Sequence, residues 1–255
     1  MKITPQQRSN EKRKRLQALR IGKTYSKRLD SARLNELERV LRLADKYPID
    51  EWSEALPKLI NEKYMKRWYR DLYIGVGLPA AREEVNEFMG QKADQYKDMW
   101  EEALEEWIRS NTGKKIKIVT GTFKDWFRGA VKEAIRDKEG IEFSVQNLFE
   151  NVMNHYVEVK EWQIRRIIQT ESLAALSVAQ AESIDALKIR YTKTWGISGH
   201  NTRPAHIVMD GVTINDDEYF VVDGEHLLYP RDIGGSASNV INCACFVIRR
   251  PIGRI

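Results

Sequence analysis

The sequence has little cysteine and no long apolar run. Its only two cysteines, Cys243 and Cys245, flank a single residue. A disulfide between such close positions would be strained, so the sequence excludes a disulfide framework within one chain and fits a reducing compartment such as a cytoplasm. No window offers the eighteen or so consecutive apolar residues of a membrane span, and residues 1–6 lack the apolar core of a signal peptide. We therefore expect no membrane partner.

Charged side chains are abundant instead. They make up 31% of the 255 residues, and the mean hydropathy is −0.54. A chain of this length can bury the core of one large domain or two modest ones. The composition is typical of a soluble, helix-rich protein.

Positive charge is concentrated at the start of the chain. Residues 1–42 hold 13 Lys and Arg against four Asp and Glu, a net charge of +9, so the other 213 residues sum to −4 within the total of +5. This basic arm either binds a polyanion, such as DNA or an acidic protein surface, or is a solvated tail. Tyr25 is its one aromatic residue, which does not favour stacking on bases. The candidate polyanion-binding residues are Lys12, Arg13, Lys14, Arg15 and Arg20.

Apolar residues recur at helical spacing through the first two thirds of the chain. The expected helices cover residues 29–44, 51–73, 80–110 and 123–138. Pro48, the Gly75–Pro79 segment and Asn111–Gly113 are expected to separate them. Residues 115–119 alternate in hydropathy, which fits a short strand or a linker.

A longer helical segment is expected to begin at Ser144, a good N-cap residue, and to continue to Arg190 as one helix or two. Beyond it, glycines divide the chain into short pieces such as 219–222 and 239–248, which favour strands. The sequence thus predicts an α+β protein, with long helices followed by a small C-terminal α+β module of short strands. The expected divisions are the basic arm (1–42), a helical region (43–160) and the module (161–255).

Short motifs follow one another in a fixed order between residues 165 and 250. They are Thr170-Glu171, Thr194-Trp195, Arg203-Pro204-Ala205-His206, Met209-Asp210-Gly211, Glu218-Tyr219-Phe220, Leu228-Tyr229-Pro230-Arg231-Asp232 and Asn239-Val240-Ile241-Asn242-Cys243-Ala244-Cys245. In order and spacing they resemble the head-morphogenesis family of tailed bacteriophages, which includes phage Mu F-like and SPP1 minor head protein-like members. Three positions depart from the family pattern: Met209 replaces Leu, Arg231 replaces Gly and Ala244 replaces Arg.

The resemblance implies a minor head protein that associates with the portal protein, and with capsid or scaffold proteins, during head assembly. It implies a place in the virion, in the head interior or at the portal vertex, and in the host cytoplasm during assembly. It implies no catalysed reaction. The module's motif residues are Glu171, Trp195, Arg203, His206, Asp210, Gly211, Tyr229, Pro230, Asp232, Asn242, Cys243 and Cys245.

The cysteines allow two interpretations. On a strand, Cys243 and Cys245 would point to the same face and, with His206 and either His200 or His226, could form a tetrahedral zinc site. Such a site would stabilise a small module with a thin core. Alternatively, the two thiols are buried as small apolar residues and the histidine is hydrogen-bonded. This alternative is favoured because Cys-x-Cys is a poorer metal signature than Cys-x-x-Cys. No other cofactor is expected.

A catalytic interpretation is weaker. His206 could act as a general base beside Asp210, with Arg203 on a phosphate. In the structural alternative, Asp210 and Asn242 hold turns and Arg203 pairs with a carboxylate. The sequence has no second carboxylate cluster for a two-metal nuclease and no Ser or Cys elbow, so we expect no enzyme. The alternatives to a minor head protein are a sequence-independent DNA-binding protein and, after it, a metal-dependent hydrolase acting on nucleic acid.

Overall fold

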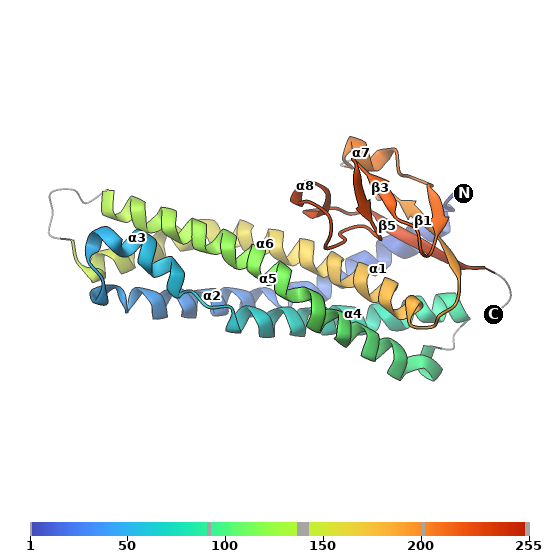
Figure 1. Cartoon of the computed structure of the whole chain (residues 1–255), viewed down its shortest axis with the longest axis horizontal. Helices are drawn as coiled ribbons and strands as arrows, with labels where there is room; N and C mark the ends of the chain where they lie inside the picture. Colours follow the sequence, from blue (N-terminus) through green and yellow to red (C-terminus); the bar gives the residue numbers. More distant parts are fainter. Residues whose placement is uncertain (1, 91–92, 137–142, 200–201, 253–255) are drawn as a thin grey trace. The chain divides into compact units, whose positions relative to one another are not determined.

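The described part of the chain is mainly helical, with short strands near its C-terminal end (Figure 1). The computed structural model describes residues 2–90, 93–136, 143–199 and 202–252. The α-helices are α1 (Pro5–Lys23), α2 (Ser26–Leu41), α3 (Trp52–Ala55), α4 (Lys63–Met89), α5 (Lys97–Arg136), α6 (Val145–Asp185), α7 (Pro204–Ile207) and α8 (Ala237–Val240). The 3-10 helices are η1 (Ala44–Lys46), η2 (Ile49–Glu51), η3 (Leu56–Leu59) and η4 (Ala93–Tyr96). The strands are β1 (Tyr191–Gly196), β2 (Thr213–Asn215), β3 (Phe220–Val222), β4 (Glu225–Leu227) and β5 (Phe246–Pro251). The predicted α+β class is confirmed.

The chain divides into two compact units, and neither is continuous in sequence. Unit 1 comprises Met1–Thr24, Arg70–Asn111 and Arg166–Ile255, and unit 2 comprises Tyr25–Tyr69 and Thr112–Arg165. The expected order of arm, helical region and module differs from this division. Residues 1–42 form two helices, α1 in unit 1 and α2 in unit 2, because long helices bring distant parts of the chain together.

Two helices begin at side-chain caps. The Thr4 hydroxyl accepts from the Gln7 amide at 3.2 Å, and the Gln7 side chain accepts from the Thr4 amide at 3.0 Å, a capping box before α1. The predicted N-cap Ser144 is confirmed, since its hydroxyl accepts from the Asn147 amide at 3.2 Å. The segment that it starts is one helix, α6, which ends at Asp185 rather than Arg190.

Two predicted helix breaks are wrong. Helix α4 continues through the Gly75–Pro79 segment, and α5 continues through Asn111–Gly113 and residues 115–119. The buried positions of α5 include Thr112, Ile116 and Thr120, at four-residue steps. Because two of these three positions are polar, apolar periodicity alone did not reveal the helix.

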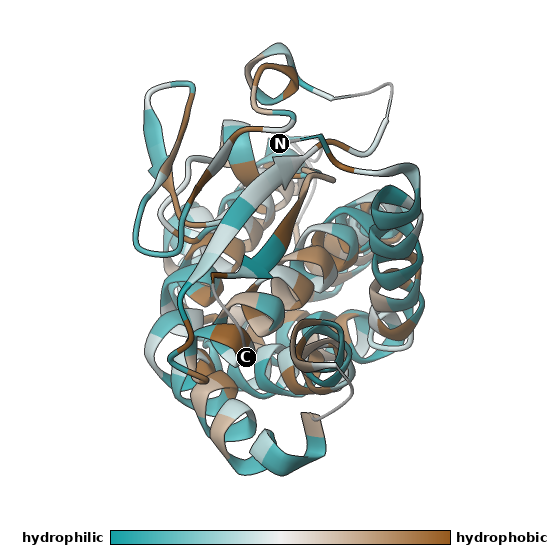
Figure 2. Ribbon diagram, turned by 90° about the vertical axis from the view of Figure 1, so that its right-hand side faces the viewer, coloured by the Kyte–Doolittle hydropathy of each residue, from teal (hydrophilic) through white to brown (hydrophobic). Residues whose placement is uncertain are grey.

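In unit 2, the helices α2, α3, α5 and α6 contribute to a hydrophobic core. Figure 2 shows polar residues (teal) and apolar residues (brown) alternating around the helices, as amphipathic packing requires. The buried core residues are Leu37, Val40, Leu41, Ala44, Trp52, Leu56, Ile60, Phe123, Phe127, Ala130, Val131, Ala134, Leu148, Val152 and Tyr156.

The strands of unit 1 form two small antiparallel sheets. One has the order β2-β1-β5, and the other is the β3-β4 hairpin. The hairpin turns at Asp223 and Gly224, whose φ values of 51° and 78° suit a two-residue turn that matches strand twist. The strand predicted at 219–222 is confirmed as β3. The one predicted at 239–248 is mostly wrong, because α8 ends at Val240 and β5 begins only at residue 246.

Helix α1 lies very close to α6 at Gly22, within unit 1. A Cβ on Gly22 would stand 1.8 Å from Ser172 Oγ and 2.8 Å from Ser172 Cβ. We expect Gly22→Ala to lower the free energy of unfolding by about 1–3 kcal/mol through overpacking. Chemical denaturation measures this loss.

The matched control for Gly22→Ala is Gly129→Ala on α5. A Cβ there meets nothing within 4 Å, so higher helix propensity should stabilise the protein by about 0.5–1 kcal/mol. Equal effects of the two substitutions would contradict the close α1–α6 approach.

None of the helices in the described ranges combines the length and the apolar character needed to cross a bilayer.

Candidate functional site

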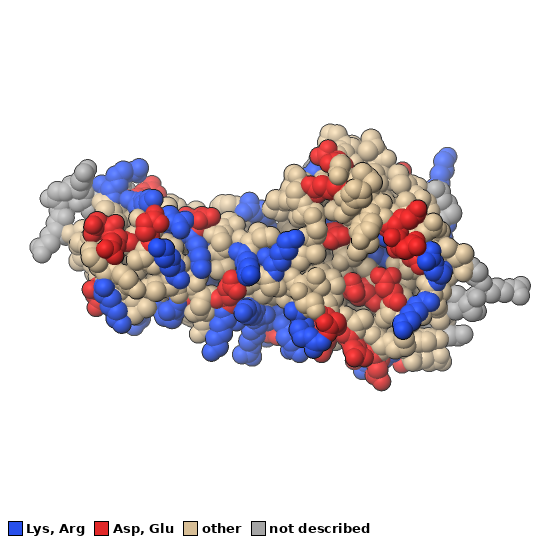
Figure 3. All heavy atoms as spheres, in the orientation of Figure 1, with Lys and Arg blue, Asp and Glu red and all other residues tan. Residues whose placement is uncertain are grey.

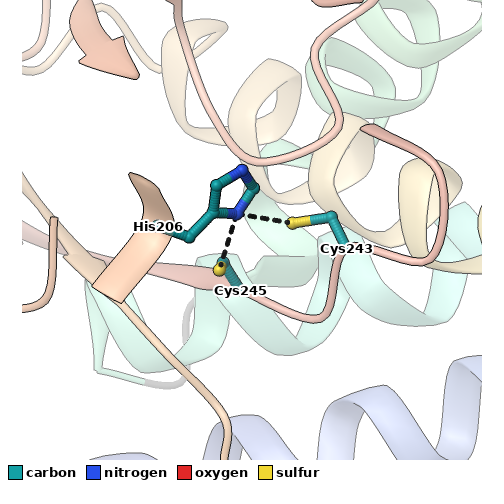
Figure 4. A group of neighbouring side chains, drawn as sticks. All are labelled: His206, Cys243 and Cys245. Carbon is teal, nitrogen blue, oxygen red and sulfur yellow. Dashed lines mark hydrogen bonds between the residues drawn. The ribbon is translucent and has the colours of Figure 1, made fainter. Parts of the chain in front are cut away.

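Three chemically reactive side chains of the motif set meet in unit 1. His206 lies on α7, and Cys243 and Cys245 lie in the irregular segment between α8 and β5. His206 Nδ1 is 3.4 Å from Cys245 Sγ and 3.6 Å from Cys243 Sγ (Figure 4). All three side chains are buried. The sequence therefore identified the cluster, although the cysteines precede the strand rather than lie on it.

Asn239 on α8 orients the His206 ring. Its Oδ1 is 3.1 Å from His206 Nε2, and its Nδ2 donates to the Val222 carbonyl at 3.3 Å. This second bond assigns the oxygen to the side facing His206. Because that oxygen can only accept, Nε2 carries a hydrogen, and in the neutral ring Nδ1 presents its lone pair to the sulfurs.

The two thiols have different proton affinities. The hydrogen bond from Cys245 lowers the pKa of Cys243 well below its ordinary value, and His206 and the charge of Arg231 add to this effect against burial. The same hydrogen bond, together with burial, raises the pKa of Cys245. The hydrogen bond with Cys243 raises the pKa of His206.

Arg231 holds the backbone that carries both cysteines. Its Nη1 donates to the carbonyls of Cys243 and Cys245, each at 2.8 Å, and its Nη2 donates to Ser177 on α6. The side chain is buried, and burial lowers the pKa of Arg231. Its backbone has a φ of 67°, in the left-handed region that favours glycine. This explains how Arg can replace the Gly of the resembled family: its hydrogen bonds offset the unfavourable backbone conformation.

Several other motif residues bind the module's own backbone. Asp210 Oδ1 accepts from the Ile197 amide at 3.0 Å, and its Oδ2 accepts from Arg8 at 2.8 Å. Arg203 donates to the Ile241 carbonyl, a backbone partner that the sequence did not predict. Arg203 precedes α7 with an extended backbone conformation.

The remaining polar motif residues hold turns or join helices. Asp232 accepts from the amides of Leu228 at 2.7 Å and Gly234 at 2.9 Å. Glu171 accepts from the Tyr73 hydroxyl at 2.9 Å. The Asn242 amide donates to Thr170 on α6 at 3.3 Å, and Asn242 and Gly211 have positive φ values of 56° and 85°. The positive φ of Asn242 fits a turn at this position.

The apolar members of the motif set form the module's core. Trp195 on β1 is fully buried, and its ring meets His206 and Phe220 edge-on, with centroid distances of 5.9 and 5.1 Å. Tyr229 and Pro230 are buried as well.

Of the two proposed fourth ligands, the structure describes only His226. His200 lies outside the described residues. His226, on β4, is exposed and contacts Tyr219 edge-on at 6.2 Å. Within the described ranges, His206, Cys243 and Cys245 form a group whose ligand atoms all lie within 4.8 Å of one another.

One candidate polyanion-binding residue is not available to a ligand. Lys14 is buried, and its Nζ lies 2.8 Å from Glu11, 2.8 Å from Glu84 and 2.6 Å from Glu87. Its expected role is therefore wrong, because its charge is already compensated inside unit 1. Gln180 on α6 also donates to Glu84, at 2.9 Å.

The other candidates differ in exposure. Arg13 pairs with Glu83, and Arg15 is half-buried, whereas Lys12 and Arg20 are exposed. Figure 3 shows Lys and Arg side chains (blue) intermixed with Asp and Glu (red) on the face that it draws.

The sequence interpretation missed three contributors to the site: Asn239 as the partner of His206, Arg231 as the clamp on both cysteines, and Ser177 as its anchor on α6. The replacement of Gly by Arg at position 231 was a signal that could have drawn attention to Arg231. No signal of comparable strength marks Ser177, because it lies 54 residues from Arg231 in sequence and meets it only through folding.

A curated protein is similar to part of this chain. The uncharacterized protein YqbB of Bacillus subtilis (strain 168) is 41% identical to it over 81 residues, which are 30% of this chain and 27% of YqbB. The chain thus matches little more than a quarter of that relative's length. No family model matches the chain, and no solved structure matches it.

Proposed function

We propose that this chain is a minor head protein of a tailed bacteriophage that associates with the portal protein during head assembly. One observation carries the proposal. The motif residues that resemble the head-morphogenesis family come together in unit 1, where they hold the module's backbone or fill its core. A motif used in this way maintains a compact module for attachment to other proteins, and its partners would bind through other, exposed residues.

The environment of His206 supports a non-enzymatic function. Its side chain is buried, and both ring nitrogens already face partners, Asn239 on one side and the two thiols on the other. Asp210, its expected catalytic neighbour, is engaged by Arg8 and the Ile197 amide. A general base must reach the proton that it removes, and this arrangement gives a substrate no direct approach. Turnover of nucleic acid that is lost in His206→Ala would contradict the proposal.

The DNA-binding alternative has less support. Of the cations expected to bind a polyanion, Lys14 is buried among three glutamates and Arg13 pairs with Glu83. A salt titration of DNA binding measures how many phosphate contacts the chain makes, because each contact adds to the slope of log affinity against log salt concentration. We expect a shallow slope, carried by exposed residues such as Lys12 and Arg20.

The association with the portal is tested by a pull-down from cells in which heads are assembling. The full chain carries an affinity tag, the lysate is treated with nuclease, and bound proteins are quantified by mass spectrometry. We expect the portal protein to be enriched over the same lysate passed over an unrelated tagged protein. A second portion of the lysate is left without nuclease. Enrichment of the portal only in this untreated portion would support the DNA-binding alternative, and no enrichment in either portion would contradict the proposal.

A further inference from the structure

We propose that His206, Cys243 and Cys245 bind a soft metal ion, Zn2+ or Cu+, which stabilises the C-terminal module. Nδ1 of His206 and the two sulfurs would be its protein ligands (Figure 4). The inference concerns the module's internal stability and does not depend on the portal interaction.

The distances fit a coordination site. In a tetrahedral zinc site, bond lengths near 2.0 Å to nitrogen and 2.3 Å to sulfur place a nitrogen and a sulfur ligand about 3.5 Å apart. The two observed Nδ1–Sγ distances are 3.4 and 3.6 Å. All three ligand atoms lie within 4.8 Å of one another. An ion therefore needs only small side-chain movements to be bound by all three.

The surroundings of the ligands resemble those of a metal site. Metal-bound histidines usually donate their other ring N–H to an oxygen, which fixes the tautomer and the ring plane. Asn239 supplies this oxygen at 3.1 Å, and the Val222 carbonyl in turn orients the Asn239 amide. Nδ1 is therefore directed at the two sulfurs before any ion binds.

The cysteine backbone is held in place independently. Arg231 donates to the carbonyls of both Cys243 and Cys245 at 2.8 Å and is anchored on Ser177 of α6. This clamp overcomes the usual weakness of Cys-x-Cys, in which the short spacing strains simultaneous ligation. It lets two sulfurs so close in sequence face one imidazole.

The chemistry of the donors narrows the ligand to a soft ion. Thiolate and imidazole favour zinc and monovalent copper, whereas magnesium and calcium require oxygen donors. When both thiols are ionised as metal ligands, the positive charge of Arg231 cancels one of the two negative charges, and one negative charge remains. Cu+ would cancel the remaining negative charge. Zn2+ would leave a positive charge, which an anionic fourth ligand would neutralise.

Metal binding is tested on the full chain, purified under reducing conditions and stripped by a chelator. Titration with Co2+, a spectroscopic substitute for Zn2+, should give a thiolate-to-cobalt charge-transfer band that saturates at one equivalent. Competition with chromophoric chelators for Zn2+ and for Cu+ then determines which ion binds more tightly. Absence of the band and less than a tenth of an equivalent of either metal, on a chain shown to be folded by circular dichroism, would overturn the proposal.

Two variants locate the site even where substitution of a cysteine prevents folding. Asn239→Ala keeps all three ligands but removes the orienting oxygen, so metal affinity should fall about 10- to 100-fold with unchanged stoichiometry. The matched control is His155→Ala in unit 2, whose Nδ1 lies 3.4 Å from Glu133 and which should leave affinity unchanged. Equal affinity in the wild-type chain and Asn239→Ala, or a loss in His155→Ala, would place the metal elsewhere and contradict the proposal.

Discussion

Replacing Lys14 by alanine is expected to lower the free energy of unfolding by about 3–5 kcal/mol, because it removes the cation from a buried charge cluster. The Lys14 side chain is 1% exposed, and its Nζ lies within 2.8 Å of carboxylates of Glu11, Glu84 and Glu87. Burial alone would lower the pKa of Lys14, but these glutamates raise it above its ordinary value. Without Lys14, Glu11 would lose its cation, and its pKa, already raised by burial, would rise further. Chemical denaturation measures the loss.

Two further variants test the cause of this loss. Lys12→Ala changes an exposed lysine of the same helix and should stay within about 0.5 kcal/mol of wild type. The double variant Lys14→Met, Glu11→Gln should recover part of the lost stability, because it removes the charge of Glu11 together with that of Lys14. Glu84 keeps a cationic partner, Arg249, at 3.3 Å. If Lys14→Ala were as mild as Lys12→Ala, the buried cluster would not exist in solution.

Replacing Arg231 by methionine is expected to cost about 3 kcal/mol, because it leaves two backbone carbonyls without their donor in a buried site. Arg231 donates to the carbonyls of Cys243 and Cys245, and methionine is similar in length but cannot donate. Arg231→Gly relieves the strain at a φ of 67° but leaves a cavity where the buried side chain lay, so it should cost at least as much as Arg231→Met. Thermal and chemical denaturation of both variants measure which of them is less stable.

The control for Arg231 is Arg190→Met, which removes an exposed arginine that pairs with Asp216 and Asp217. A surface pair contributes at most about 1 kcal/mol. A loss in Arg190→Met as large as that in Arg231→Met would contradict the clamp, as would no loss in Arg231→Met.

The sequence predicted the fold class well but did not predict α1, and the reason is physical. The buried face of α1 comprises Glu11, Lys14, Ala18 and Gly22, which follow one another at helical spacing. A hydropathy scale treats Glu11 and Lys14 as exposed and gives Ala18 and Gly22 little weight, so the segment shows no apolar face in sequence. Only the partners on other helices, such as Glu84 and Ser172, make this face a packing surface.

The site was predicted in part for a related reason. His206, Cys243 and Cys245 are residue types rare in this chain, so they stood out in sequence. Asn239 and Ser177 are ordinary residues whose importance comes from the atoms that they meet, at the carbonyl of Val222 and at the guanidinium of Arg231. Such partners are brought together by folding and leave little trace in local sequence.

The proposed head function is tested most directly by the protein content of purified particles. Procapsids and mature heads are isolated from cells that produce the phage, and this chain is quantified by mass spectrometry against the portal protein. Our account predicts that the chain is present in procapsids in a low, fixed ratio to the portal. Its absence from both kinds of particle would contradict the account.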